Sequence, residues 1–419
     1  MTCQKTVRDS GMTIVTEAMD SVRSVALGIW FQVGSRDEAP AEAGMSHFME
    51  HMMFKGTPTR DARQLSEAFD RLGAQQNAFT SKECTCYFAS FLDESLEGVF
   101  DLLGDMVCHA NLAQDQCELE RQVIIEEIAR GEDDPDDVAS ELFAATLWPQ
   151  HALGLPIAGT REIVGGFGRD AAVDFRARHY SANNCIVAAA GNLEHERLVE
   201  LAQRYLADLP LADTLPQRSA PQDSASARAF KRKDTEQAQI YLGTTAIDGA
   251  DERRYALALG NNILGGTMSS RLFQEIREKE GLVYATYSTP QLYQDAGLLA
   301  LYSGTRPENA EHVCELMERE FDRIAREPVS ADELEMARQS AKGALALSLE
   351  STSRRMIALA QNELFGSPQL SFDELLTRYD AVTIDDIAAV MADLGARPRT
   401  LAVVGPFAQQ NFELEGEQK

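Results

Sequence analysis

The pattern of apolar and polar residues changes its period along the chain. Short strand-like runs cover residues 13–17, 24–33 and 85–91, and stretches with helical spacing lie between them. The strands lie close together between helices rather than alternating strictly with them, which favours a largely antiparallel sheet with helices packed on it. A doubly wound parallel sheet is the less suitable alternative. The pattern therefore predicts an α+β fold.

The pattern repeats itself after about 215 residues. Gly28 and Gly243 lie in two strand-like runs, SVALGIWFQVG and AQIYLGTTAIDG, and are 215 residues apart. The tripeptide ELE opens a helix at residues 118–120 and another at 333–335, and the runs CIVAAAGN and TLAVVGP look like two equivalent closing strands. Self-similarity at a fixed offset indicates a duplicated structural unit. We therefore expect two homologous repeats, each a largely antiparallel sheet with helices packed on it.

The boundary between the repeats lies where the regular spacing of apolar residues is lost. The stretch LPLADTLPQRSAPQDSASARAF is rich in proline, serine and alanine and has no regular apolar spacing. This stretch predicts a first domain at 1–209, a linker at 210–236 and a second domain at 237–419.

Charge and composition narrow the classes of partner. The 66 acidic residues outnumber the 39 lysines and arginines, and the resulting formal charge of −27 argues against nucleic acid, which needs a basic surface. The longest apolar runs fall far short of the roughly 20 residues needed to cross a bilayer, so no membrane contact is expected. Seven scattered cysteines and an N-terminus without the layout of a secretory signal predict reduced thiols and a cytoplasmic protein. Cys84 and Cys86 share one face of a strand, and small core residues are the better interpretation of them than a metal-binding pair.

The segment GMSHFMEHMMFKGTP carries two of the chain's seven histidines, four residues apart. On a helix, His47 and His51 project from the same face, with Glu50 beside the second ring. Two neutral imidazoles suit a zinc ion, and the carboxylate would stand next to the position open to water. The order H-x-x-E-H is that of the inverzincins. A histidine pair packed against a core of methionines and Phe48 is the structural alternative for so short a motif.

A catalytic zinc site needs a third protein ligand. The helical stretch ELERQVIIEEIARGEDD places Glu120 and Glu127 two turns apart inside an apolar stripe, whereas Glu126 points away from it. A buried carboxylate without a partner is costly, so a cation or a shared proton is expected beside this pair. Glutamates that merely give the helix a polar face are the alternative.

Four segments together carry a family resemblance: HFMEHMMFKGT, GAQQNAFTSKECTCYFAS, ELERQVIIEEI and LGGTMSSRLFQEIREKEGLVYATYS. They resemble the pitrilysin family of zinc metallopeptidases, in particular its two-domain branch with the mitochondrial processing peptidase beta subunit and its bacterial homologues. The resemblance implies one zinc ion per chain, held by His47, His51 and Glu127 of the first domain. It also implies Glu50 as the general base that activates a zinc-bound water, and Glu120 as a carboxylate supporting the catalytic site. The implied activity is hydrolysis of peptide bonds.

The resemblance also assigns substrate contacts. Asn77, Ala78 and Phe79 correspond to an edge strand to which an extended peptide adds, and an ordinary turn and strand is the alternative. Arg277 and Tyr284 correspond to a pair in the second domain that binds the peptide backbone, and a surface arginine beside a strand tyrosine is the alternative. Family members enclose their peptides in a closed chamber, which limits substrates to short or unfolded polypeptides. The acidic run RGEDDPDD is compatible with a preference for basic peptides and equally with a solvated loop.

Two α+β units make half of the closed chamber of the family, so the chain is expected to pair. Because it carries both the zinc motif and the Arg277 and Tyr284 pair, the resemblance predicts a homodimer rather than a chain that depends on a different subunit. A non-catalytic homologue of the same fold, like the core subunits of the respiratory bc1 complex, is the competing hypothesis. Such subunits typically lack a complete metal set, whereas this chain has all five site residues.

Overall fold

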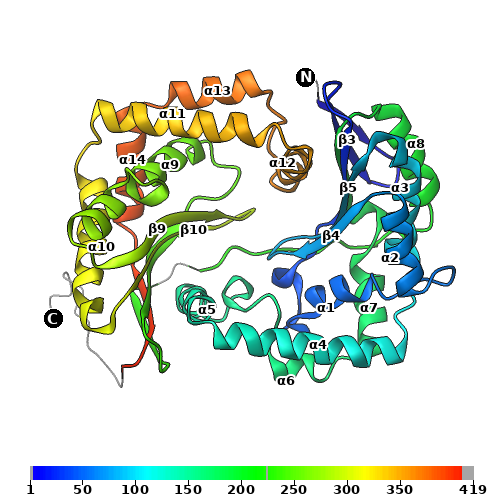
Figure 1. The fold of residues 1–419 in the computed structure, drawn as a ribbon, viewed down its shortest axis with the longest axis horizontal. Coiled ribbons are helices and arrows are strands. Elements are labelled where there is room, and N and C mark those ends of the chain that lie inside the picture. The colour runs from blue at the N-terminus through cyan, green and yellow to red at the C-terminus, as the bar shows by residue number, and fades with distance from the viewer. Residues whose placement is uncertain (1–2, 223–224, 408–419) are drawn as a thin grey trace. The chain divides into compact units, whose positions relative to one another are not determined.

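A computed structural model describes residues 3–222 and 225–407 of the chain. The chain forms two compact units, each assembled from separate stretches of sequence (Figure 1). Unit 1 consists of Met1–Ala129, Leu155–Arg218 and Leu347–Ser371, and unit 2 of Arg130–Gly154, Ser219–Ala346 and Phe372–Lys419.

Unit 1 contains a six-stranded sheet in the order β1-β2-β6-β3-β5-β4. The β2 and β6 strands are parallel, and all other neighbours are antiparallel. The strands are β1 (Cys3–Val7), β2 (Thr13–Ala18), β3 (Ser24–Phe31), β4 (Gln75–Thr80), β5 (Thr85–Leu92) and β6 (Cys185–Gly191).

Unit 2 contains a five-stranded sheet in the order β7-β11-β8-β10-β9, in which β7 and β11 are parallel and the other pairs antiparallel. The order and directions match those of β2-β6-β3-β5-β4, so the prediction of two homologous, largely antiparallel repeats is confirmed. The strands are β7 (Ala227–Arg232), β8 (Ala238–Ala246), β9 (Val283–Leu292), β10 (Gly297–Thr305) and β11 (Thr400–Gly405). The β7 strand lies inside the range 210–236, so part of the segment expected as a linker belongs to the second sheet.

Helices cover the sheets of both units. No helix among the described residues is long and apolar enough to cross a membrane. The α-helices are α1 (Met45–Met52), α2 (Ala62–Arg71), α3 (Leu96–His109), α4 (Gln114–Asp133), α5 (Pro135–Leu147), α6 (Arg161–Val164), α7 (Arg169–His179), α8 (His195–Tyr205), α9 (Arg254–Asn261), α10 (Ala310–Arg326), α11 (Ala331–Ser348), α12 (Thr352–Leu364), α13 (Phe372–Ala381) and α14 (Ile384–Gly395).

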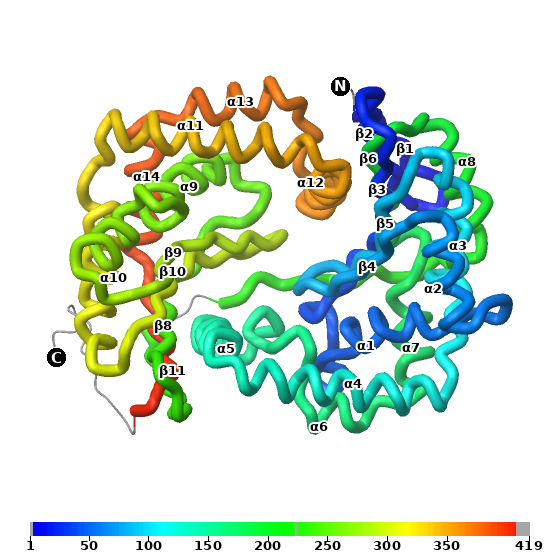
Figure 2. Tube along the Cα trace, in the orientation of Figure 1, coloured from blue at the N-terminus to red at the C-terminus, as the bar shows by residue number. Residues whose placement is uncertain are grey.

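The two repeats exchange one helix each. Helix α12 lies late in the sequence but packs on β2, β3 and β6 of unit 1, and α5 lies early but packs on β7, β8 and β11 of unit 2 (Figure 2). Met356 and Ala360 of α12 pack with Ala188 and Ala190 of β6, on the face of the sheet opposite the larger core. Both faces of the central strands β6 and β3 of the first sheet are therefore buried.

The glycines that mark the repeat lie under the exchanged helices. A Cβ atom at Gly28 would lie 2.8 Å from the Met356 sulfur of α12, and one at Gly243 would lie 2.8 Å from Phe143 Cζ of α5. Glycine lets each helix approach its strand closely.

The cysteines contribute to packing. Cys84 and Cys86 are buried, and both belong to the core cluster that contacts α12. Burial raises the pKa of the Cys84 thiol to about 11, which keeps it protonated at neutral pH. All seven cysteines are free thiols.

Candidate metal centre

Helix α1 presents two different faces. Met45, Phe48, Met49 and Met52 are fully buried in the core of unit 1, whereas His47, Glu50 and His51 on the other side are partly exposed. This separation follows from helical spacing. The histidines therefore point away from the core, although their apolar neighbours in the sequence fill it.

The start of α1 is held by a carboxylate from the preceding loop. Glu38 accepts the backbone N–H groups of Gly44 (2.7 Å) and Ser46 (2.6 Å), which have no partner inside the helix. Gly44 adopts φ 99°, and a Cβ atom there would lie 2.5 Å from the Ala158 carbonyl oxygen, so only glycine fits. Burial raises the pKa of Glu38 to about 7, although the N–H donors act in the opposite direction.

His47 and His51 face Glu127 of α4. The Glu127 Oε2 atom lies 3.8 Å from His47 Nε2 and 3.4 Å from His51 Nε2, and the two ring centroids are 4.8 Å apart. One ligand atom from each of the three residues lies within 4.8 Å of the other two. The structure therefore brings together all three residues predicted as metal ligands.

The chemistry of this group fits a zinc ion. Burial, and secondarily the proximity of His51, lowers the pKa of His47 to about 4, so its imidazole is neutral at physiological pH, as a ligand must be. Two imidazole nitrogens and a carboxylate oxygen form a common catalytic zinc ligand set.

Glu120 supports His51 from behind. Its side chain is 8% exposed, its Oε2 atom lies 3.0 Å from His51 Nδ1, and its Oε1 atom lies 2.6 Å from Lys55 Nζ. A carboxylate on the second nitrogen fixes the tautomer and orientation of a ligating histidine. Lys55 is the cation expected for a buried glutamate, although the sequence did not identify it.

The buried face of α4 is narrower than the spacing of its apolar residues predicted. Glu120 and Ile124 are buried, but Glu127 has a half-exposed side chain and Val123 is 44% exposed. The helix packs on unit 1 along the side of Cys117, Glu120 and Ile124. Only one of the two carboxylates expected on the buried face lies there.

Glu50 is held by the edge strand. The Thr80 hydroxyl, at the end of β4, donates to Glu50 Oε2 at 2.7 Å. Burial raises the pKa of Glu50, and the hydrogen bond from Thr80 opposes this effect. Thr80 was not among the residues predicted from the sequence, because no local pattern links it to Glu50.

The strand expected to bind substrate is the last strand of its sheet, so one of its edges is open. The Ser81 N–H donates to the Cys84 carbonyl across the turn. Every second residue of an antiparallel strand directs its backbone N–H and C=O to the same side, so Phe79 and Asn77 also direct theirs to β5. Ala78 directs its groups to the open edge, where its N–H is bonded to Asn77 Oδ1 at 2.9 Å. The Phe79 ring packs edge-on against Trp30 at 5.2 Å.

Arg277 and Tyr284 lie together in unit 2. Arg277 lies in the helical segment η7 (Phe273–Lys279) and Tyr284 in β9, the edge strand of the second sheet. The guanidinium carbon lies 4.6 Å from the centroid of Phe273 and 5.4 Å from that of Tyr284. Tyr284 is 80% exposed and therefore open to a ligand.

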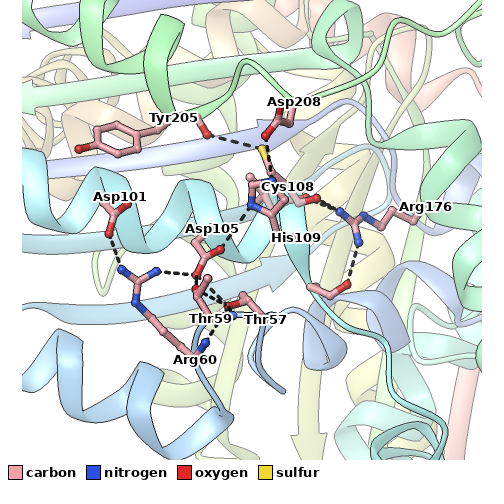
Figure 3. A network of polar contacts seen from close by, with 12 residues as sticks. Thr57, Thr59, Arg60, Asp101, Asp105, Cys108, His109, Arg176, Tyr205 and Asp208 are labelled. Atoms are coloured by element: carbon pink, nitrogen blue, oxygen red, sulfur yellow. Dashed lines mark hydrogen bonds and ion pairs between the residues drawn. The ribbon is translucent and has the colours of Figure 1, made fainter.

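The segment that follows α1 is anchored to α3 by a polar network (Figure 3). Asp105 accepts hydrogen bonds from the hydroxyls of Thr57 (2.8 Å) and Thr59 (3.0 Å) and from the Arg60 guanidinium (2.6 Å), which also contacts Asp101 at 2.6 Å. Burial would raise the pKa of Asp105, but these donors outweigh it and the pKa is lowered. The network fixes the chain just beyond Lys55.

Models of known protein families match both halves of the chain. Residues 13–161 match the family model described as insulinase (peptidase family M16), and residues 166–341 match the one described as peptidase M16 inactive domain. The chain is 40% identical over 413 residues to an uncharacterized zinc protease of Streptomyces coelicolor, covering 97% of this chain and 90% of that protein. It is 36% identical over 405 residues to the uncharacterized zinc protease YmxG of Bacillus subtilis, covering 97% of each.

Solved structures share the fold. A peptidase M16 inactive domain from Pseudomonas fluorescens superposes with a TM-score of 0.92 at 21% identity, covering 98% of this chain and all of that one. A chain of complex III2 from Candida albicans superposes with a TM-score of 0.83 at 19% identity, covering 96% of each.

Proposed function

Because the chain belongs to the M16 family of peptidases and retains a complete set of metal-binding groups, we propose that it is a zinc metalloendopeptidase. The observation that carries the proposal is the convergence of His47, His51 and Glu127 on one point. The buried contact of Glu120 with His51 supports it, because a histidine that only fills space does not need such a partner.

The residues of the centre divide the work of peptide hydrolysis. His47, His51 and Glu127 would hold one zinc ion, which supplies Lewis acidity and lowers the pKa of water. Glu50 takes a proton from the attacking water and delivers it to the leaving amine. Its Oε2 atom is bonded to Thr80, so Oε1 is the oxygen left for this transfer. Glu120 keeps the His51 ring oriented.

The substrates proposed are short or unfolded polypeptides, enclosed in a chamber. An open sheet edge supports this proposal, since an extended peptide adds to such an edge through its backbone. In this proposal Ala78 contributes backbone hydrogen bonds, Asn77 and Phe79 flank the bound strand, and Arg277 and Tyr284 bind the peptide backbone. A preference for basic peptides, a cytoplasmic location and a homodimer are further parts of the proposal.

Two variants separate metal binding from proton transfer. Glu50→Gln should retain zinc and lose peptidase activity by a factor of about 100 or more, because only the base is removed. His47→Ala should lose both zinc and activity. The measurements are metal content of the purified protein and cleavage of a quenched fluorescent peptide, with and without chelator. Equal zinc loss in both variants would contradict the assignment of Glu50 as the base.

A non-catalytic role is the second candidate. The match of residues 166–341 to an inactive domain and the fold shared with a chain of complex III2 support it. A wild-type protein that binds zinc but cleaves none of a diverse set of unfolded peptides would favour this role.

A further inference from the structure

The edge of β4 ends at the proposed catalytic base. The backbone groups of successive residues in a strand point to opposite sides. Because the Ser81 N–H is bonded to the Cys84 carbonyl of the hairpin, the backbone groups of Gln76, Ala78 and Thr80 point to the open edge. Thr80 is the last residue of the strand. Thr80 is therefore the next residue after Ala78 whose backbone N–H and C=O groups face the open edge.

Thr80 binds Glu50 through its hydroxyl. This hydroxyl lies 2.7 Å from Glu50 Oε2, and the backbone of Thr80 makes a smaller contribution that lowers the pKa of the same carboxylate. The other acceptor near the hydroxyl is the Ser46 carbonyl, at 3.4 Å, so the proton goes to the nearer and charged oxygen. The carboxylate is thus held at the end of β4, by the residue two positions after Ala78.

We propose that Thr80 is a positioning residue for Glu50, holding the carboxylate where the open edge of β4 ends. This inference rests on the proposed function and deepens it. A glutamate side chain has several rotamers, and a base must be held within a fraction of an ångström to be effective. A short hydrogen bond from a residue on a rigid strand favours one rotamer. Because a peptide would pair with the same edge, its position and that of the base are set by a single element.

The test removes the hydroxyl without changing the shape of the side chain. Thr80→Val keeps the β-branch and the N–H, and Thr80→Ser keeps the hydroxyl. In Thr80→Val we expect kcat for a quenched peptide to fall about 10-fold or more with KM changed less than about twofold, because transition-state placement is lost and ground-state binding is kept. Thr80→Ser should retain most of the wild-type kcat. Zinc content should be unchanged in both variants.

Thr85→Val is the matched control. Thr85 lies opposite Thr80 in the hairpin, and its buried hydroxyl donates to the Val33 carbonyl at 2.9 Å rather than to Glu50. This variant should lower the melting temperature and leave kcat unchanged. An equal loss of kcat in both valine variants, or a rise in KM alone in Thr80→Val, would overturn the proposal, since either result points to strand integrity or peptide binding.

A crystallographic readout does not depend on peptidase activity. In zinc-loaded crystals of wild type and Thr80→Val, the Glu50 carboxylate should leave its wild-type rotamer only in the variant. An unmoved carboxylate would overturn the inference. If the wild-type protein cleaves no peptide and the carboxylate still moves in the variant, the proposed function fails and the positioning role stands.

Discussion

Three carboxylates surround the histidine pair, and each is restrained differently. Glu120 is buried between His51 and Lys55, Glu50 is fixed by Thr80, and Glu127 has a side chain that is 47% exposed. These restraints match the proposed roles. Glu120, which would orient a ring, and Glu50, which would transfer a proton, must be held by the protein, whereas a bound metal would order the exposed ligand Glu127.

This arrangement predicts how Glu120 and Lys55 affect zinc affinity. Glu120→Gln should weaken zinc binding about 10- to 100-fold, because the neutral amide orients His51 less strongly. Lys55→Met should weaken it less, since it leaves the contact with His51 intact. The measurement is competition with a chromogenic chelator. Lys5→Met, which breaks the exposed ion pair with Glu363, is the control and should leave zinc affinity unchanged. Equal affinities of Glu120→Gln and wild type would contradict the prediction.

Glu38 predicts a pH dependence of stability. Its pKa in the folded state, about 7, lies above the ordinary value of 4.5. The folded state therefore binds the proton more tightly, so this contribution to stability is full below about pH 4.5 and is lost as pH rises through about 7. Wild type should lose on the order of 2–3 kcal/mol relative to Glu38→Gln between pH 5 and 8. Chemical denaturation of both proteins across this range is the measurement, and parallel curves would contradict the prediction.

Sequence patterns predicted the residues of the centre that are close in sequence and could not predict those that meet through the tertiary fold. The i, i+4 spacing placed His47 and His51 on one face, and the cost of a buried carboxylate anticipated a cation or a shared proton beside Glu120 and Glu127. Its identity as Lys55 depends on the turn after α1, and the contact of Thr80 with Glu50 depends on how β4 passes the helix. Glu127 and Val123 are exposed because α4 packs along a narrow stripe.

At the scale of elements, the internal repeat was visible, but the exchange of α5 and α12 was not. An amphipathic pattern shows that a helix buries one face and does not show which sheet it covers. The β7 strand was also missed. Among the described residues it pairs only with β11, at the edge of its sheet, and all six of its residues are half-buried or exposed, so its apolar alternation is weak.

The atoms around the two repeat glycines predict the effect of alanine at each position. At Gly243 a Cβ atom would lie 2.2 Å from the Leu299 carbonyl oxygen, which is backbone and cannot move aside, so Gly243→Ala should destabilise by about 2–3 kcal/mol. At Gly28 the nearest atoms are Trp30 Nε1 at 2.6 Å and the sulfur of the flexible Met356 at 2.8 Å; both belong to side chains, so Gly28→Ala should cost less, about 1–2 kcal/mol. Urea denaturation of each variant is the measurement.

Gly343→Ala is the control for this pair. Gly343 lies inside α11, and a Cβ atom there meets nothing within 4 Å. Alanine should stabilise this helix by about 0.5–1 kcal/mol, because glycine is the poorer helix former. If Gly243→Ala were as stable as Gly343→Ala, the close contacts with the Leu299 carbonyl and the Phe143 ring would not be the reason for glycine in β8.

At the scale of the whole molecule, the chain combines two sets of candidate functional residues. The proposed zinc ligands His47, His51 and Glu127 belong to unit 1, and Arg277 and Tyr284 belong to unit 2. The proposed homodimer would build each active site from the first unit of one chain and the second unit of its partner. A closed assembly of this kind gives two equivalent sites.

Mixing two inactive variants tests the shared site. Glu50→Gln lacks the base and Tyr284→Phe lacks the tyrosine hydroxyl, so each homodimer should be nearly inactive. After subunit exchange, a mixed dimer should contain one site with both groups intact, because each chain supplies what the other lacks. We expect recovery of up to about a quarter of wild-type peptidase activity in an equal mixture, since about half of the dimers are mixed and each has one of two sites intact. Activity that stays at the level of the separate variants despite demonstrated exchange, or an active enzyme that sediments as a monomer, would show that Tyr284 acts within its own chain.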